Sequence, residues 1–224
     1  MTISQDSTVL LSVRGTLKPT SLEAAKRLHN ETAGSAPGIA AARALGDLSH
    51  KVYVPVPGPG ESDSELLFLD VWQTAEGLGQ FFSNPVVHEQ AGNLFSTRDA
   101  AIWMPARGAF GFNLPAPTGK TERYLGIVRG LVTSPEQAIS AFRSSISPHI
   151  ADARRRGQLS HELFFRLPMP GESTAPELLG IDVWYDPEGM QEHYGKLSGY
   201  EAAFTARPDT SVWREPSGGG FSEW

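Results

Sequence analysis

The sequence predicts an α+β fold in which two βαββαβ repeats follow one another in a single chain. Two observations predict it: a long internal repeat, and the same order of strand and helix signals in both copies. A third is compositional, since 40% of the 224 residues are hydrophobic, which is enough for a packed core. No apolar run approaches the roughly 18 residues that a membrane-spanning helix needs.

The repeat is clearest between residues 37–62 and 148–173, which align without gaps and are identical at more than half of their positions. The match continues on both sides, upstream with Val-Arg-Gly in each copy and downstream with an acid-Val-Trp triplet in each copy. We therefore expect an N-terminal unit over residues 1–104, a Gly/Pro-rich linker over 105–122, and a C-terminal unit over 123–224.

Four strands are predicted in each copy, from β-branched and apolar runs that turn residues bound. The first strands are expected over 8–17 and 124–132, the second over 50–56 and 161–167, the third over 66–72 and 178–184, and the fourth over 100–103 and 210–213. A turn rich in proline and glycine separates the second strand from the third in each copy.

Helices are predicted between the strands from their capping residues. Ser134 is an N-cap candidate with Pro135 at the first helical position, and Thr20 is expected to play the same role in the first copy. Thr74 and Asp186 occupy matching N-cap positions after the third strands. A shorter helix in each copy is expected to stop at Gly46 or Gly157, with the basic run 154–156 near the negative end of its dipole. The last helix of each copy is expected to run toward Phe95 or Phe204.

The order βαββαβ is the split pattern of ferredoxin-like folds. Such a unit covers one face of its sheet with helices and leaves the other face apolar, so that the second face must also be buried. We expect the two repeats to pack as an intramolecular dimeric α+β barrel, which shields both apolar faces.

Charge and composition limit the classes of partner. The formal net charge is −6 and cysteine is absent, so disulfides and thiolate metal sites are excluded and a nucleic-acid partner is not expected. Residues 1–7 show no secretory signal, and with the missing cysteines this favours the cytoplasm. We expect a small-molecule substrate, no membrane partner, and either a monomer with an internal pseudo-dimer or a homodimer.

The third strand and the helix after it resemble a known family. The stretch 69–78, with Asp70 and Trp72, is similar to the antibiotic biosynthesis monooxygenase group of dimeric α+β barrel proteins, in which an acid-x-Trp pattern is followed by a helix that carries a histidine. The second copy fits with Asp182, Trp184 and His193, whereas Phe81 stands at the histidine position of the first. The resemblance therefore favours a working site in the second half.

This resemblance implies a cofactor-independent monooxygenase, or a related tailoring enzyme, that acts on a small aromatic or polyketide-like substrate in an apolar barrel pocket. A histidine or tryptophan at the pocket would hold the substrate anion, and no cofactor or metal is then required. The candidate catalytic residues are His193, His161, Asp182 and Trp184. The candidate substrate-binding residues are His50, Trp72, Asp70, Arg129 and Tyr194.

Alternatives remain at this point. The same group includes haem-binding proteins, so a haem- or small-ligand-binding barrel without oxygenase activity is the second hypothesis, although the predicted strand 124–130 lacks the asparagine of haem-degrading members. A barrel whose pockets are filled by side chains is the third. Asp70 and Asp182 each need a partner in an apolar strand, and Arg14 and Arg129 on the neighbouring first strands are the candidates.

Overall fold

The computed structural model describes residues 8–56, 64–169, 171–172, 175–216 and 220–224. The predicted turn 57–62 of the first repeat, the N-terminal residues 1–7 and most of the glycine run 218–220 lie outside these ranges. The chain divides into two compact units. Unit 1 contains residues 1–104 and 215–224, and unit 2 contains residues 105–214.

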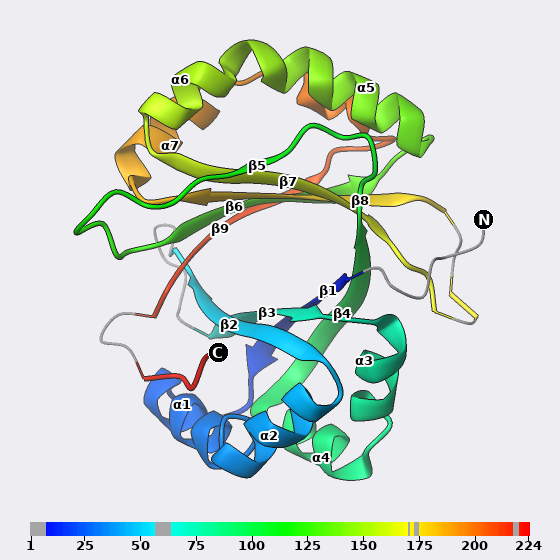
Figure 1. Ribbon diagram of the computed structural model, residues 1–224, viewed down its shortest axis with the longest axis vertical. Coiled ribbons are helices and arrows are strands. Elements are labelled where there is room, and N and C mark those ends of the chain that lie inside the picture. The colour runs from blue at the N-terminus through cyan, green and yellow to red at the C-terminus, as the bar shows by residue number, and fades with distance from the viewer. Residues whose placement is uncertain (1–7, 57–63, 170, 173–174, 217–219) are drawn as a thin grey trace. The chain divides into compact units, whose positions relative to one another are not determined.

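Unit 1 has the predicted βαββαβ order. Its strands are β1 (Val9–Leu17), β2 (Asp47–Pro55), β3 (Glu65–Trp72) and β4 (Phe95–Pro105), and its helices are α1 (Leu22–Glu31), α2 (Ala36–Ala44), α3 (Ala75–Phe82) and α4 (Pro85–Leu94). The strands pair in the order β4-β1-β3-β2, with antiparallel neighbours. The helices cover one face of this sheet (Figure 1).

Unit 2 repeats this plan and adds one short strand. Its strands are β5 (Phe112–Asn113), β6 (Tyr124–Leu131), β7 (Gln158–Arg166), β8 (Glu177–Trp184) and β9 (Asp209–Arg214), in the order β9-β6-β8-β7-β5. Its helices are α5 (Pro135–Ile146), α6 (Ile150–Arg155) and α7 (Pro187–Tyr194), with 3₁₀ turns at Ser147–His149 and Tyr200–Ala203. The predicted α+β fold class is therefore confirmed for each unit.

Most predicted helix ends are confirmed by their caps. Ser134, Thr74 and Asp186 each accept hydrogen bonds from backbone N–H groups of the first turn, which satisfies donors that the helix itself leaves free. The prediction for Thr20 is wrong, because Ser21 caps α1 by accepting from Ala24 N at 3.2 Å. Helix α6 ends at Arg155 before Gly157, whose φ of 107° lies in the left-handed region that glycine tolerates.

Some strand boundaries differ from the prediction. Strands β2 and β7 begin three residues earlier than expected, and β4 begins at Phe95 rather than at residue 100. The polar run 96–99 faces solvent while its backbone pairs with β1, so side-chain polarity concealed the strand. The expected final helix is split in each copy, because Asn84 and Pro85 start α4 in unit 1 and a 3₁₀ turn follows α7 in unit 2.

The chain segment that follows the fourth strand of each repeat belongs to the other compact unit. The segment after β4 belongs to unit 2, where Phe112 pairs with His161 on β7. The segment after β9 belongs to unit 1, where Trp224 pairs with His50 on β2. The sequence repeat instead predicted a linker over residues 105–122, and it placed residues 215–224 in the C-terminal unit.

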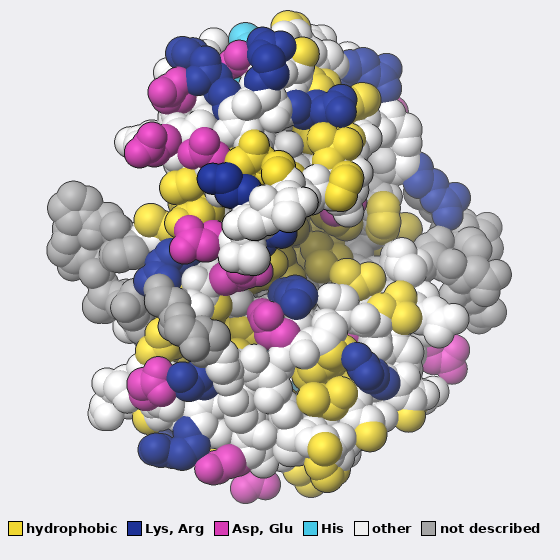
Figure 2. All heavy atoms as spheres, turned by 60° about the vertical axis from the view of Figure 1, so that its left-hand side comes forward, with side chains coloured by type: hydrophobic (Ala, Val, Ile, Leu, Met, Phe, Trp, Pro, Cys, Tyr) yellow, Lys and Arg dark blue, Asp and Glu magenta, His cyan; other side chains and the backbone are white. Residues whose placement is uncertain are grey.

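Within the part of the chain that is described, no helix is both long and apolar enough to cross a membrane. On the face displayed in Figure 2, basic and acidic side chains are interspersed. The basic run at the end of α6 shares this pattern, since Arg155 and Arg156 both pair with Asp152, at 3.2 and 2.6 Å.

Candidate active site

Each unit carries a histidine–aspartate pair on two adjacent strands. In unit 2, His161 on β7 lies opposite Asp182 on β8, and its Nδ1 lies 2.7 Å from the aspartate Oδ1. In unit 1, His50 Nδ1 lies 2.5 Å from Asp70 Oδ1 in the same register. Both imidazoles are buried, at 5% and 4% exposure, so each ring is held in a fixed orientation.

The aspartates also set the charge of these rings. Burial opposes a charged imidazole, but the charge and the hydrogen bond of Asp182 outweigh it and raise the pKa of His161 above its usual value. Asp70 raises the pKa of His50 in the same way, with help from the charges of Asp47 and Glu223. A raised pKa makes each histidine a stronger base than free imidazole, with a proton that the aspartate stabilises.

In unit 2 this pair extends into a longer chain of hydrogen bonds. Tyr194 Oη donates to Asp182 Oδ2 at 2.8 Å, and Trp184 Nε1 donates to Tyr194 Oη at 3.3 Å. Burial and the nearby Asp182 charge raise the pKa of Tyr194 well above its usual value, so the phenol remains a proton donor. Four predicted site residues, His161, Asp182, Trp184 and Tyr194, thus lie in one network.

A glycine leaves the space that this network needs. A Cβ on Gly126 would lie 1.9 Å from Tyr194 Oη, so only glycine leaves the space for that hydroxyl. Gly126 lies opposite Asp182, and Leu11 occupies the corresponding place opposite Asp70 in unit 1. There Phe82 aligns with Tyr194 and brings no hydroxyl. Among the described residues, Trp72 Nε1 is accordingly buried without a hydrogen-bond partner.

This packing predicts a coupling between Gly126 and Tyr194. We expect Gly126→Ala and Tyr194→Phe each to lower the free energy of unfolding by about 1–2 kcal/mol, through overpacking and through the lost hydrogen bonds respectively. The double variant should lose at least about 0.5 kcal/mol less than the sum, because the closest overlap, with the hydroxyl, is gone, although the overlap with ring carbon Cζ at 2.6 Å remains. Urea unfolding of the four proteins measures the coupling, and strictly additive losses would refute it.

The two tryptophans predict a second difference. Trp184→Phe removes a satisfied indole donor, whereas Trp72→Phe removes one that is buried and unsatisfied. Since both changes shrink the ring equally, we expect Trp184→Phe to lower the free energy of unfolding by at least about 1 kcal/mol more than Trp72→Phe does. Equal losses in denaturant titrations would show that Trp72 has found a partner of its own.

A pocket lies beside His161 in unit 2. Phe110, Phe142, Ile146 and Leu163 form its apolar wall, and Arg143 adds a positive charge. Its open volume is about 220 Å³, but its enclosed part has room for about one water molecule. Within the described residues, His161 Nδ1 is engaged by Asp182 and the other ring nitrogen, Nε2, has no hydrogen-bond partner.

Unit 1 has no such vacancy at its histidine. Counting from the caps Ser21 and Ser134, His29 on α1 corresponds to Phe142 on α5. His29 Nε2 lies 3.1 Å from His50 Nε2, and its Nδ1 lies 3.0 Å from Asn30 Oδ1. The second ring nitrogen of His50 is therefore already bonded, whereas that of His161 is available.

The other candidate residues lie near this network or apart from it. His193 on α7 is buried and packs against Trp184 with ring centroids 5.3 Å apart, and burial lowers its pKa. Phe81 packs against Trp72 at 5.4 Å in the corresponding place of unit 1, which confirms that the two positions match. His193 is thus a neighbour of the tryptophan, and its side chain makes no hydrogen bond within the described residues.

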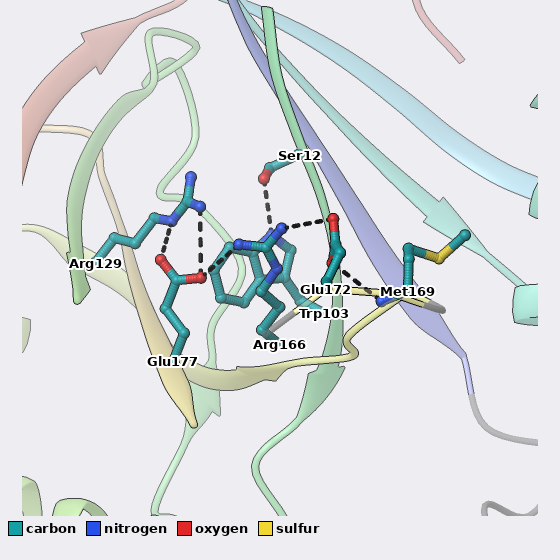
Figure 3. Close-up of polar contacts among 7 residues, drawn as sticks. All are labelled: Ser12, Trp103, Arg129, Arg166, Met169, Glu172 and Glu177. Carbon is teal, nitrogen blue, oxygen red and sulfur yellow. Dashed lines mark hydrogen bonds and ion pairs between the residues drawn. The ribbon is translucent and has the colours of Figure 1, made fainter. Parts of the chain in front are cut away.

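The expected pairing of the aspartates with arginines is wrong. The register places Arg129 opposite Leu179, three residues from Gly126, so its side chain lies on the other face of the sheet from Asp182. Arg129 instead donates to Glu177 at 2.6 Å, and Arg166 joins the same carboxylate at 2.9 Å (Figure 3). In unit 1, Arg14 binds Glu65 at 3.0 Å. Arg129 is therefore part of an ion-pair network and lies away from the pocket.

Comparison with known proteins supports the fold. No family model matches the chain, and no curated protein does. An anthrone oxidase-like protein of known structure matches with a TM-score of 0.63 and 13% identity, over 93% of this chain and 91% of that one. A proposed monooxygenase from Lactobacillus acidophilus matches with a TM-score of 0.59 and 11% identity, over 94% and 95%.

The likeness extends to peroxidases. The dye-decolorizing peroxidase of Mycobacterium smegmatis matches with a TM-score of 0.57 and 8% identity, over 96% of this chain and 94% of that one. At these identities the likeness concerns the fold, so the α+β fold predicted from the repeat is the one that these solved structures share.

The pocket beside His161 does not fit a haem. It has room for about one water molecule, so a haem would have to displace several wall residues, whereas a single aromatic ring has to displace Phe110. The ring of His193 is covered by Trp184, Tyr194 and His149. Among the described residues, no group of three or more acidic or histidine side chains has the arrangement of a metal site.

Proposed function

We propose that the chain is an oxidoreductase of the cofactor-independent monooxygenase type, with its active site at His161 in unit 2 and a small aromatic phenol as substrate. The observation that carries the proposal is the ring nitrogen Nε2 of His161. It has no protein partner in the described residues and borders an apolar pocket, while Asp182 holds the opposite nitrogen.

In this mechanism His161 takes the phenolic proton of the substrate on Nε2. The raised pKa of His161 favours this transfer, and Asp182 stabilises the resulting imidazolium. Tyr194 and Trp184 keep the aspartate in place by hydrogen bonds. The imidazolium then donates a hydrogen bond to the phenolate, and Arg143 at the pocket wall adds attraction for the anion.

The electron-rich phenolate reduces dioxygen directly. For an anthrone-type substrate, one CH₂ group and one O₂ molecule give one C=O group and one water, so the reaction needs no other oxidant or reductant. The apolar wall keeps bulk water away from the anion. A ring must enter by moving Phe110, which lies on the segment before β5 and is 43% exposed.

Oxygen uptake tests the proposal. We expect the protein to consume one O₂ for each anthrone or naphthol-like phenol oxidised, in buffer treated with chelator. Binding of these phenols without oxygen uptake would instead support the second candidate, a small-ligand-binding barrel. Uptake that disappears with chelator would contradict cofactor independence.

A further inference from the structure

The residues around His50 in unit 1 form a box of aromatic rings. The ring of His29 stacks on that of His50 with centroids 5.1 Å apart, and Phe68 meets both rings at 5.5 and 5.1 Å. The free side of His50 is closed by residues 220–224, which we call the cover segment. This segment lies beside α1 and β2, near the end marked C in Figure 1.

The cover segment occupies the box as a bound peptide would. The indole of Trp224 stacks on His50 at 4.7 Å and 25°, and Phe221 packs against His29 at 5.3 Å. His50 N donates to Trp224 O at 2.8 Å, and Trp224 N donates to His50 O at 3.3 Å. Backbone pairing with a strand, with side chains in adjacent pockets, is a recurrent mode of peptide recognition.

Polar contacts also hold the segment, and one of them is a hydrogen bond that Asn30 Nδ2 donates to Gly220 O. Val52 N donates to Glu223 at 2.8 Å, Lys51 lies 3.3 Å from the same carboxylate, and Ser222 N donates to Asn30 at 2.8 Å. Trp224 Nε1 is buried and lies near the Asp47 carboxyl, although it meets no strict hydrogen-bond geometry among the described residues.

The corresponding place in unit 2 is more open. Phe112 pairs with His161 there, but its ring is 6.5 Å away, and Phe110 leaves the pocket described above. Phe221 in unit 1 is only 9% exposed, against 43% for Phe110. Both units contain the His–Asp pair. In unit 2 the pair borders a partly open pocket, whereas in unit 1 the aromatic side chains of the cover segment lie over it.

We propose that the His50 box of unit 1 is a binding site for an electron-rich planar aromatic ligand, and that the cover segment competes with this ligand by placing Trp224 in its position. The stack on a histidine that is paired with Asp70 selects electron-rich rings such as indole or naphthol. This inference does not depend on the function proposed for unit 2.

The test uses indole as the probe and titration calorimetry on the full chain, because indole has no phenolic proton to give to His161. We expect Trp224→Gly to bind indole at least tenfold more tightly than the wild type. Trp224→Phe should bind as weakly as the wild type, because a ring still covers His50. His50→Ala in the Trp224→Gly background should weaken binding at least tenfold, whereas His88→Ala in that background, which removes an exposed histidine, should leave it within twofold.

A second measurement uses the unmodified chain. Saturating indole should increase deuterium uptake in the peptide that contains residues 220–224, because the ligand displaces the cover segment. Indole binding that is unchanged in Trp224→Gly, or that does not depend on His50, overturns the proposal. If Trp224→Gly does not fold, unchanged deuterium uptake of the wild type at saturating indole overturns it.

Discussion

Replacing His161 by alanine is expected to lower the rate of phenol-dependent oxygen uptake roughly 10²–10⁴-fold, the usual contribution of a positioned acid–base group. His161 is the proposed acceptor of the substrate proton, and the alanine variant leaves Asp182 and Tyr194 without the ring that they orient. Most of the loss should appear in kcat, because Arg143 and the apolar wall still bind the substrate. Initial rates from an oxygen electrode over a range of substrate concentrations separate kcat from KM.

The matched control is His88→Ala, which removes an exposed histidine on α4. Its rate should stay within twofold of the wild type. Asp182→Asn should give an intermediate loss and move the acid limb of the pH–rate profile to lower pH, because the carboxylate that raises the pKa of His161 is gone. A fully active His161→Ala protein that remains folded would place the chemistry elsewhere.

The repeat made the order of elements predictable, because each copy carries its own caps, turns and alternating strands. Helix starts are indicated by the N-caps Ser134, Thr74 and Asp186, whose hydrogen bonds involve only neighbouring residues of the chain. The fourth strand of unit 1 was less predictable at residues 96–99, where polar side chains face solvent and only backbone pairing marks the strand.

The site was predicted in part. The acid-x-Trp pattern located Asp182 and Trp184, and the paired histidines located His50 and His161, but the partner of each aspartate depended on strand register. An offset of three residues puts Arg129 and Asp182 on opposite faces. His29 was not predicted, although aligning the repeats from Ser21 and Ser134 would have set it against Phe142.

The cover segment was beyond local sequence reasoning. Phe221 and Trp224 follow a glycine run without periodicity, and their contacts with His29 and His50 join residues far apart in the chain. Gly126 is a related case, because its role depends on the hydroxyl of Tyr194 from a distant helix. Contacts of this kind join residues far apart in the chain, so the sequence alone does not show which residues meet.

The buried His29 predicts a dependence of stability on pH. Burial, with the nearby His50, lowers the pKa of His29 to about 4, from 6.5. When His50 carries a proton on both ring nitrogens, as its raised pKa favours, its Nε2 donates to Nε2 of a neutral His29, whose Nδ1 donates to Asn30 Oδ1. Protonation would point two N–H groups at each other across 3.1 Å.

Because the folded-state pKa lies below the unfolded one, this group stabilises the fold fully above pH 6.5, and its contribution is lost as pH falls toward 4. The loss amounts to about 3 kcal/mol. Burial and the neighbouring Asp70 raise the pKa of Asp47 to about 7. The contribution of Asp47 to stability therefore increases as pH falls from 7 to 4, and it opposes the loss at His29. The contribution of His29 must therefore be measured as a difference between two proteins.

His29→Phe supplies that comparison, because phenylalanine occupies the matching position 142 in unit 2. We expect the variant to be less stable than the wild type at pH 7, since His50 loses an acceptor, and to approach or exceed it at pH 4. Unfolding by urea between pH 4 and 8 gives both curves, and His88→Phe should follow the wild type. Parallel curves for His29→Phe and wild type would show that folding does not lower the pKa of His29, and would contradict the prediction.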